Sequence, residues 1–190
     1  MAVRGGDAAV RADKQLVMQG YFKTRAQAQA AIAAGGVLVD GRVLAKASAR
    51  IAEGAVIEAQ AAHPYVSRAA LKLAAGLDAF GFDPAGRLCL DVGASTGGFT
   101  QLLLEHGAAH VAAVDVGRGQ LDGALRADPR VLSLEATDAR RLTLDLIGGR
   151  APDLVVCDAS FIALAKVLPV PLSLAAPGAR VVALFKPQFE

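Results

Sequence analysis

The stretch from Leu88 to Thr100 constrains the possible folds of this chain more than any other part of the sequence. An apolar run that ends in Asp91 is followed by a glycine-rich turn and then by residues that favour a helix. Glycines permit a sharp turn and the close approach of a ligand, because they lack a Cβ atom. Open α/β sheets bind nucleotides at such turns, at the carboxyl ends of strands. The stretch therefore predicts a strand, a ligand-binding turn and a helix of an α/β fold.

Asp91 and the glycine spacing narrow the class of ligand. The turn lacks the Gly-x-Gly-x-x-Gly pattern of dinucleotide-binding folds, which argues against a dehydrogenase. A carboxylate directly before the turn would repel a pyrophosphate, whereas it suits a ligand with a cationic amino-acid end. S-adenosylmethionine (SAM) has such an end, and we expect SAM to bind here. The alternative is an ordinary strand, turn and helix that bind no ligand.

The pattern from residue 67 onward predicts a mostly parallel, doubly wound sheet, because strands alternate with helical stretches. The expected elements are a helix at 67–80 and strands at 88–91, 111–115, 131–135, 154–158 and 180–186. Acidic residues stand at or just beyond the ends of the first four strands, and these are Asp91, Asp115, Asp138 and Asp158. Any one of them could be a cap or a surface residue, but four successive strand ends favour a shared site.

Two of these acids have expected roles at a bound nucleoside. An acid at the end of the second strand, such as Asp115, commonly binds ribose hydroxyls. Asp138 follows the third strand, where its side chain could face an adenine amino group. The candidate cofactor-binding residues are Asp91, Gly93, Ser95, Thr96, Gly97, Gly98, Phe99, Asp115, Val116, Asp138 and Ala139.

Composition points to a soluble, cytoplasmic protein. The chain is 54% apolar, but no apolar run reaches the ~18–20 residues that span a bilayer, and no signal peptide is evident. Cys89 and Cys157 fall inside expected buried strands, so we expect free thiols. The three histidines show no metal-ligand spacing, and no metal site is expected.

Basic residues are concentrated in the first part of the chain. Residues 1–72 carry ten Lys or Arg against five Asp or Glu, whereas residues 73–190 carry ten against thirteen. A basic front favours a polyanionic partner, although scattered basic residues also occur on ordinary solvated faces. The elements expected here are helices at 11–20 and 25–34, the second capped by Thr24, and strands at 37–39, 43–44 and 50–58.

The order of residues in this front resembles the S4 RNA-binding domain. The resemblance rests on Arg11, Leu16-Val17, Gly20, Thr24-Arg25, Ala28, Ile32, Gly35 and the segment Val37 to Gly41. It implies an exposed helical face that binds structured RNA through phosphates, which provides affinity without reading sequence. The candidate RNA-binding residues are Arg11, Lys14, Lys23, Thr24, Arg25 and, beyond the S4-like part, Arg68.

The rest of the chain resembles the FtsJ-like ribose 2′-O-methyltransferases. Lys72, Asp158 and Lys186 match the Lys-Asp-Lys part of that family's Lys-Asp-Lys-Glu tetrad. With the S4-like front, the segments 91–100, 114–121 and 186–190 are similar to the TlyA family of rRNA cytidine 2′-O-methyltransferases, also labelled haemolysin A. The resemblance implies SAM as cofactor and ribosomal RNA or ribosomal subunits as partner. It also implies that Lys72, Asp158 and Lys186 are catalytic.

Lys186 is the base that this resemblance implies for the ribose hydroxyl. A lysine can act as a base where burial and a nearby positive charge lower its pKa. We therefore expect Lys72 and Lys186 to meet near Asp158, with the carboxylate orienting both ammonium groups.

The two resemblances imply a small S4-like α+β domain at 1–60, a linker at 61–66 and a Rossmann-like SAM-dependent methyltransferase domain at 67–190. Arg118 and Gly123 stand where the family has aromatic residues near its second motif. Relative to the family, the chain stops at Glu190, before further strands and the tetrad glutamate. We therefore expect a sheet truncated after its fifth strand, which could self-associate through Val181–Phe185 and have little activity.

Two other functions stay open at this point. One is an S4-type RNA-binding protein that retains SAM binding but has weak catalysis. The other is a membrane-acting haemolysin, as the second family label suggests. The sequence does not support it, since it has no long apolar span, export signal or basic amphipathic helix of interfacial type.

Overall fold

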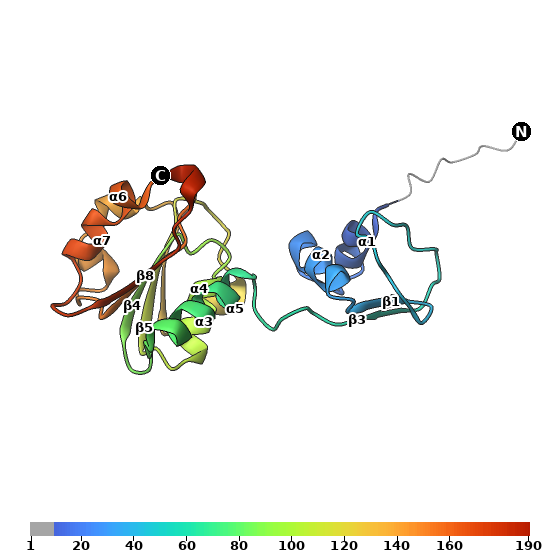
Figure 1. The fold of residues 1–190 in the computed structure, drawn as a ribbon, viewed down its shortest axis with the longest axis horizontal. Helices are drawn as coiled ribbons and strands as arrows, with labels where there is room; N and C mark the ends of the chain where they lie inside the picture. The colour runs from blue at the N-terminus through green and yellow to red at the C-terminus, as the bar shows by residue number, and fades with distance from the viewer. Residues whose placement is uncertain (1–9) are drawn as a thin grey trace, which may run out of the picture. The chain divides into compact units, whose positions relative to one another are not determined.

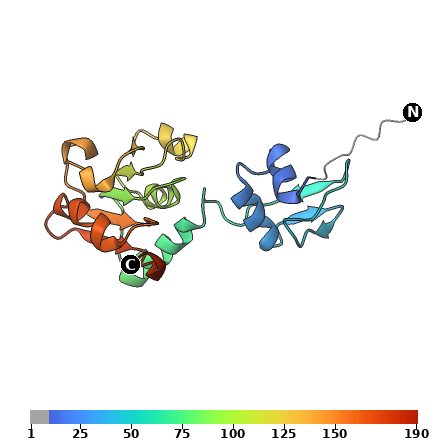
Figure 2. The same cartoon turned by 90° about the horizontal axis from the view of Figure 1, so that it is seen from above.

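The computed structural model describes residues 10–190, and the chain divides into two units between Pro64 and Tyr65. Figure 1 shows that each unit has its own helices and its own sheet, and Figure 2 shows the same elements from above. We call residues 10–64 the front unit and residues 65–190 the second unit. Residues 1–9 lie outside the described residues. The start of the predicted first domain falls there, and so does the segment in which the sequence shows no evident signal peptide.

The front unit packs two helices against a small antiparallel sheet. Its elements are α1 (Ala12–Met18), α2 (Arg25–Ala33), β1 (Val37–Val39), β2 (Arg42–Val43) and β3 (Ile57–Ala59), with strand order β2-β1-β3. Leu16, Ile32 and Val37 are buried in a common core that joins the helices to the sheet. The expected cap of α2 is confirmed, because Thr24 accepts a hydrogen bond from the Gln27 N–H at 3.3 Å.

The expected strand at 50–58 is wrong for most of its length. Only Ile57–Ala59 pairs with β1, whereas Ile51 is buried in irregular backbone. Gly54 lies in a turn with φ of +78°, a value that glycine adopts without the steric cost other residues meet. The Val56 N–H donates to Asp40 Oδ1 at 2.9 Å, so the turn between β1 and β2 holds this segment in place.

The second unit contains a parallel sheet, which confirms the predicted doubly wound fold. Its strands are β4 (Leu88–Val92), β5 (His110–Val114), β6 (Val131–Leu134), β7 (Leu154–Cys157) and β8 (Arg180–Ala183), in the order β6-β5-β4-β7-β8. Asp115 and Asp158 directly follow β5 and β7, and β8 ends before Lys186. In the described sheet β8 forms an edge, and the expected self-association through it stays a prediction.

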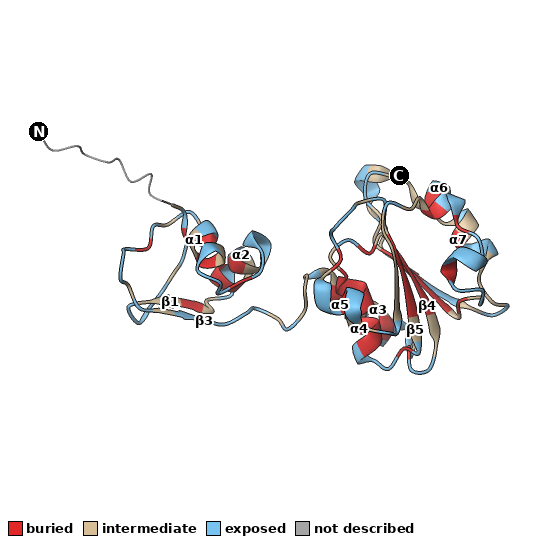
Figure 3. Cartoon of the chain, turned by 180° about the vertical axis from the view of Figure 1, so that it is seen from behind, coloured by how far each residue is buried: buried red, intermediate tan, exposed pale blue. Residues whose placement is uncertain are grey.

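Helices cover both faces of this sheet (Figure 1). One face carries α3 (Ala69–Phe80), α4 (Gly98–Glu105) and α5 (Gly123–Ala127). The other carries α6 (Leu164–Val167), α7 (Pro169–Ser173) and the short 3₁₀ helices η1 (Ala139–Arg141) and η2 (Asp145–Ile147), and η3 (Pro187–Phe189) follows β8. Successive side chains of a strand alternate between the two layers, as Val155 and Val156 of β7 do. Figure 3 shows the resulting burial of the central strands.

Candidate cofactor and catalytic site

The candidate site lies at the carboxyl ends of β4, β5 and β7, at the switch point of the sheet. The chain leaves β4 toward β5 and β6 on one side and later returns to place β7 on the other side. Doubly wound sheets bind ligands at this point. Gly93 follows β4 with φ of +83°, and a Cβ atom there would lie 3.0 Å from both N and Cα of Ala159. Gly93 therefore lets the turn after β4 lie against the backbone next to Asp158.

Asp91 is a fully buried carboxylate with one oxygen that lacks a hydrogen-bond partner. Its Oδ2 accepts a hydrogen bond of 2.7 Å from the hydroxyl of Thr100, which is also fully buried, whereas Oδ1 has no partner. Burial raises the pKa of Asp91 to about 7, and the hydrogen bond from Thr100 opposes that rise. A buried acceptor without a partner fits a cationic donor, such as the ammonium group of SAM.

Asp115 joins the glycine turn to the loop after β5. Its Oδ2 accepts a hydrogen bond from the Ser95 N–H at 2.8 Å, and its Oδ1 accepts one from the Gly117 N–H at 2.7 Å. Ser95 has φ of +49° and donates its hydroxyl to Gln120 Oε1 at 3.1 Å. A carboxylate accepts about four hydrogen bonds, so Asp115 retains acceptor capacity for ribose hydroxyls.

The glycines at the start of α4 have a packing role in this structure. Gly97 has φ of +97°, and a Cβ on it would clash with the side chain of Leu125 in α5. A Cβ on Gly98 would clash with Ser67 Oγ just before α3. Phe99 is buried in the core on this face of the sheet. These residues bring α4 close to its neighbouring helices.

The remaining candidate cofactor-binding residues differ in their burial and in their hydrogen-bond partners. Asp138 caps η1 and forms an ion pair with Arg140 at 2.6 Å, and this guanidinium holds the pKa of Asp138 at about 2. Ala139 is buried, whereas Val116 is 73% exposed. The Thr96 carbonyl accepts a hydrogen bond from the Asp122 N–H at 3.2 Å. Asp138 therefore already has a cationic partner, which the sequence did not reveal.

Lys186 and Asp158 form the catalytic candidate pair. Lys186 Nζ lies 2.5 Å from Asp158 Oδ1, and the two side chains are only 18% and 16% exposed. The same ammonium donates to the Asp158 carbonyl oxygen at 3.1 Å and to Ser160 Oγ at 2.8 Å. The ends of the neighbouring strands β7 and β8 thus fix this lysine through several partners.

Lys72 does not reach this pair, contrary to the expectation that both lysines meet near Asp158. It lies on an exposed position of α3 and, within residues 10–190, its side chain forms no ion pair or hydrogen bond. The neighbouring Leu73 and nearby Leu77 are the residues through which α3 packs on the core. A long lysine side chain on the outer face of such a helix extends into solvent.

Sequence reasoning missed several residues that hold the site together. Thr100 is a polar residue in the apolar start of α4, and such a residue needs a buried partner, so its position offered a signal. Glu135 accepts hydrogen bonds from the N–H groups of Gln120 and Leu121, at 2.6 and 3.1 Å, which hold its pKa below the usual range. Ser160 had no signal, because its contact with Lys186 joins loops that are distant in sequence.

The residue after Ser160 has an unusual backbone conformation. Phe161 has φ of +64°, which is uncommon for an aromatic residue, and its ring centroid lies 5.1 Å from that of Phe189. Phe161 is 89% exposed. Such strained positions cluster at functional sites.

The candidate RNA-binding residues of the front unit are concentrated at the starts of its helices. Arg11 and Arg25 both form ion pairs with the buried Asp13. Lys14 is exposed on α1, and Lys23 precedes the cap of α2. Arg68 belongs to the second unit, where it directly precedes α3.

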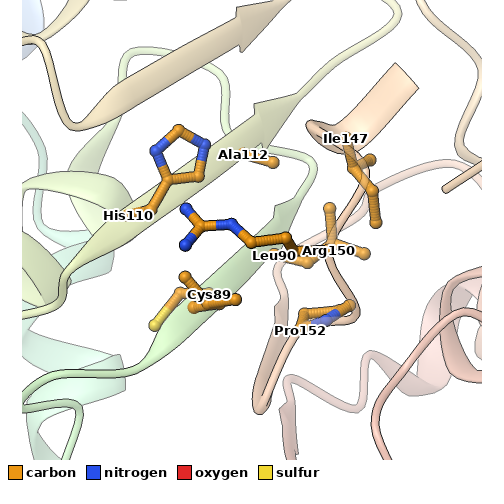
Figure 4. A pocket seen from close by; sticks show the side chains of 8 residues that line it. Cys89, Leu90, His110, Ala112, Ile147, Arg150 and Pro152 are labelled. Carbon is orange, nitrogen blue, oxygen red and sulfur yellow. The ribbon is translucent and has the colours of Figure 1, made fainter. Parts of the chain in front are cut away.

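A separate small cavity lies at the opposite, amino-terminal end of the strands (Figure 4). It is lined by Leu88, Cys89, Leu90, His110, Ala112, Ile147, Arg150 and Pro152. Burial and the nearby Arg150 guanidinium lower the pKa of His110. Both cysteines are buried free thiols, as expected. Within residues 10–190, the structure has no cluster of acidic, histidine and cysteine side chains suited to a metal ion.

Two family models match the two units of the chain. The S4 domain model matches residues 10–57, and the FtsJ-like methyltransferase model matches residues 65–190. A Mycobacterium tuberculosis protein named 16S/23S rRNA (cytidine-2′-O)-methyltransferase TlyA is 50% identical over 182 residues, which are 95% of this chain and 68% of that protein. Hemolysin A of Brachyspira hyodysenteriae is 39% identical over 181 residues, which are 95% of this chain and 75% of that protein.

Solved structures show the same similarity. A structure of a Streptococcus thermophilus protein described as a hemolysin superposes with a TM-score of 0.71 at 38% identity, covering 95% of this chain and 67% of that one. A second, from Lactococcus lactis, has a TM-score of 0.64 at 42% identity and covers 66% of this chain and 61% of that one. In the described part of this chain, no helix combines the length and the apolar character that crossing a membrane requires.

Proposed function

Because the chain belongs to the FtsJ-like methyltransferase family, we propose that it methylates the 2′-hydroxyl of a cytidine in ribosomal RNA. The observation that carries this proposal is the Lys186–Asp158 pair, which lies beside the glycine turn of a fold that uses SAM. The Mycobacterium tuberculosis relative is named for cytidine methylation in 16S and 23S rRNA, which supports this choice of substrate.

The proposed contacts to the cofactor come from Asp91 and Asp115. SAM supplies a methyl group on a cationic sulfonium when it is bound. Asp91 is suited to its ammonium group, since the carboxylate is buried and one oxygen has no partner. Asp115 offers its remaining acceptor capacity to the ribose hydroxyls, while its present hydrogen bonds keep the glycine turn in shape.

Lys186 is the proposed base. In its neutral form, Nζ would accept the proton of the 2′-hydroxyl, which would leave that oxygen able to take the methyl group that bound SAM would supply. The proton then remains on Nζ, where Asp158 and Ser160 stabilise the resulting ammonium. For Lys72 to take part, its side chain has to turn from solvent toward Asp158 when RNA binds.

The front of the chain is the proposed RNA anchor. Residues 1–60 would bind RNA phosphates, the linker at 61–66 would connect them to the methyltransferase domain at 67–190, and Arg68 would add a contact there. The S4 match and the basic helix starts support this division. A cytoplasmic location would fit a ribosomal RNA substrate, and it is the location that we propose.

Mapping of 2′-O-methyl groups tests the proposed function most directly. Ribosomal RNA from cells with and without the gene is compared at nucleotide resolution, and purified protein is incubated with radiolabelled SAM and unmethylated 16S and 23S rRNA. We expect a cytidine 2′-O-methyl group that depends on the gene and is restored by the purified protein. Methylation of a base instead of a ribose, or identical maps with and without the gene, would contradict the proposal.

SAM affinity is expected to rise with pH up to about 7. Free Asp91 binds a proton below that pH, because burial raises its pKa to about 7, and the SAM ammonium favours the ionised form. Binding must then release the proton, so the Kd should fall by up to about tenfold per pH unit from pH ~5 to ~7. Calorimetry in two buffers of different ionisation enthalpy measures the released proton. A Kd that is independent of pH over this range would exclude contact between Asp91 and the ammonium.

Charge reversal on the front unit tests the RNA anchor. Lys14→Glu with Lys23→Glu should weaken binding of 16S and 23S rRNA and reduce the slope of log K against log salt by about 0.7–0.9 for each lost phosphate contact. Arg42→Glu with Lys46→Glu is the matched control, since it makes the same charge change at exposed positions of the front unit. SAM affinity should stay unchanged in both. Equal RNA binding by the two double variants would mean that the helix starts are not the anchor.

A further inference from the structure

Asp13 connects the starts of both front helices through one carboxylate. It lies in α1 and its side chain is 0% exposed. Arg11 donates to it through Nε and Nη2, at 3.1 and 3.2 Å, and Arg25 donates through Nη2 at 3.0 Å. Gln29 of α2 adds a bond of 2.5 Å, and the backbone N–H of Lys14 adds one of 2.9 Å. The carboxylate therefore fixes two arginines and both helices at the same point.

The two guanidinium groups remain accessible although their partner is buried. The side chains of Arg11 and Arg25 are 51% and 54% exposed. Within residues 10–190, Nη1 of each arginine makes no hydrogen bond. Both groups bind Oδ2 of the same carboxylate, so they lie next to each other with N–H groups still available.

The charges in this cluster do not cancel. The hydrogen bond from Arg11 keeps the pKa of Asp13 far below its usual range, with help from Gln29 and Arg25, so the carboxylate is ionised at neutral pH. One negative charge then faces two positive guanidinium groups. A buried ion pair by itself is weak evidence for stability, because an apolar replacement often serves equally well. The surplus positive charge at an accessible surface instead suits an anion.

We propose that Asp13 is a positioning residue that holds Arg11 and Arg25 together as a clamp for an RNA phosphate. This inference rests on the proposed RNA binding by the front of the chain. A guanidinium presents a planar fork that matches phosphate oxygens. An arginine that is already fixed loses less side-chain entropy when it binds. Asp13 thus contributes to RNA affinity without contacting RNA.

Asp13→Asn distinguishes a positioning role from simple electrostatics, because the two hypotheses predict opposite changes in RNA affinity. The variant makes the front more positive by one charge, so electrostatics alone predicts tighter RNA binding. Loss of the Asp13 carboxylate would leave both arginines unfixed. The proposed clamp therefore predicts that affinity for 16S and 23S rRNA falls by about tenfold. Glu53→Gln is the matched control, since it makes the same charge change at an exposed position of the front unit.

Kinetic and spectroscopic readouts separate positioning from a purely structural role. We expect Asp13→Asn to raise the KM for rRNA while kcat and SAM affinity stay unchanged, and the NMR signals of the Arg11 and Arg25 side-chain Nε–H groups to lose their dispersion. If the variant does not fold, Arg11→Lys with Arg25→Lys keeps the charge but removes both forks. That double variant should also bind rRNA about tenfold more weakly.

Defined outcomes overturn the inference. RNA binding by folded Asp13→Asn that is as tight as that of Glu53→Gln would exclude the clamp, as would wild-type affinity in the double lysine variant. The charge reversal at Lys14 and Lys23 distinguishes failure of the clamp from failure of the proposed RNA binding by the front unit. If that reversal weakens RNA binding and the clamp variants do not, the front binds RNA by other groups. If none of the variants changes binding, the front is not the RNA anchor.

Discussion

Lys186→Ala is expected to lower kcat for 2′-O-methyl transfer by about 10²–10⁴-fold, the usual contribution of a general base. Lys186 Nζ is the only ammonium in the described part of the chain that pairs with Asp158, which leaves no other lysine in place to accept the proton. SAM affinity should change little, because the proposed cofactor contacts come from β4 and β5. Single-turnover transfer of radiolabelled methyl to 16S and 23S rRNA measures the effect.

Lys186→Arg distinguishes a base from a fixed positive charge. Arginine retains the charge and can pair with Asp158, but its pKa is too high to release a proton. We expect this variant to be as inactive as Lys186→Ala. Lys166→Ala, which removes a lysine from an exposed position of α6, is the control and should retain full turnover. Substantial activity in Lys186→Arg would mean that Lys186 acts through its charge, and the proposed proton transfer would be wrong.

The sheet of the second unit was predictable because its signals are local. Apolar runs such as Val111–Val114 alternate with helical stretches, and Gly93 marks the turn after the first strand. The strand expected at 50–58 was wrong because the apolar Ile51 is buried in irregular backbone and does not pair in a strand. An apolar residue indicates burial, and it indicates a strand only where apolar and polar residues alternate over several positions.

The sequence predicted which residues lie at the site, but it did not predict their hydrogen-bond partners. Strand ends placed Asp91, Asp115 and Asp158 at one edge of the sheet, since the carboxyl ends of parallel strands meet there. Partners such as Thr100 for Asp91 depend on side-chain packing between elements, which a sequence pattern does not encode. The same limit explains Lys72, because the sequence predicted its position on a helix but did not decide whether its side chain meets Asp158 or extends into solvent.

Asp91→Asn is expected to weaken SAM binding by about 100-fold while it stabilises the free protein. The amide cannot pair with the SAM ammonium as a carboxylate does, and an interaction with a buried charge is strong. The free protein gains because the buried carboxylate has a pKa of about 7, against an ordinary value of 3.8. Between these values the folded state binds more protons than the unfolded state, so the free energy of unfolding falls as pH rises.

The stabilisation by Asp91→Asn should therefore depend on pH. It should be absent near pH 4, grow toward pH 7 and stay constant above it, with an upper limit of about 4 kcal/mol from the pKa difference. Thermal unfolding of the SAM-free protein across this range measures the gain, and calorimetry measures the lost affinity. Asp78→Asn, at an exposed position of α3, is the control for the charge change and should alter neither. If Asp91→Asn binds SAM as tightly as wild type, the ammonium lies elsewhere. A variant that is less stable than wild type at pH 8 would show that Asp91 is ionised and satisfied in the free protein.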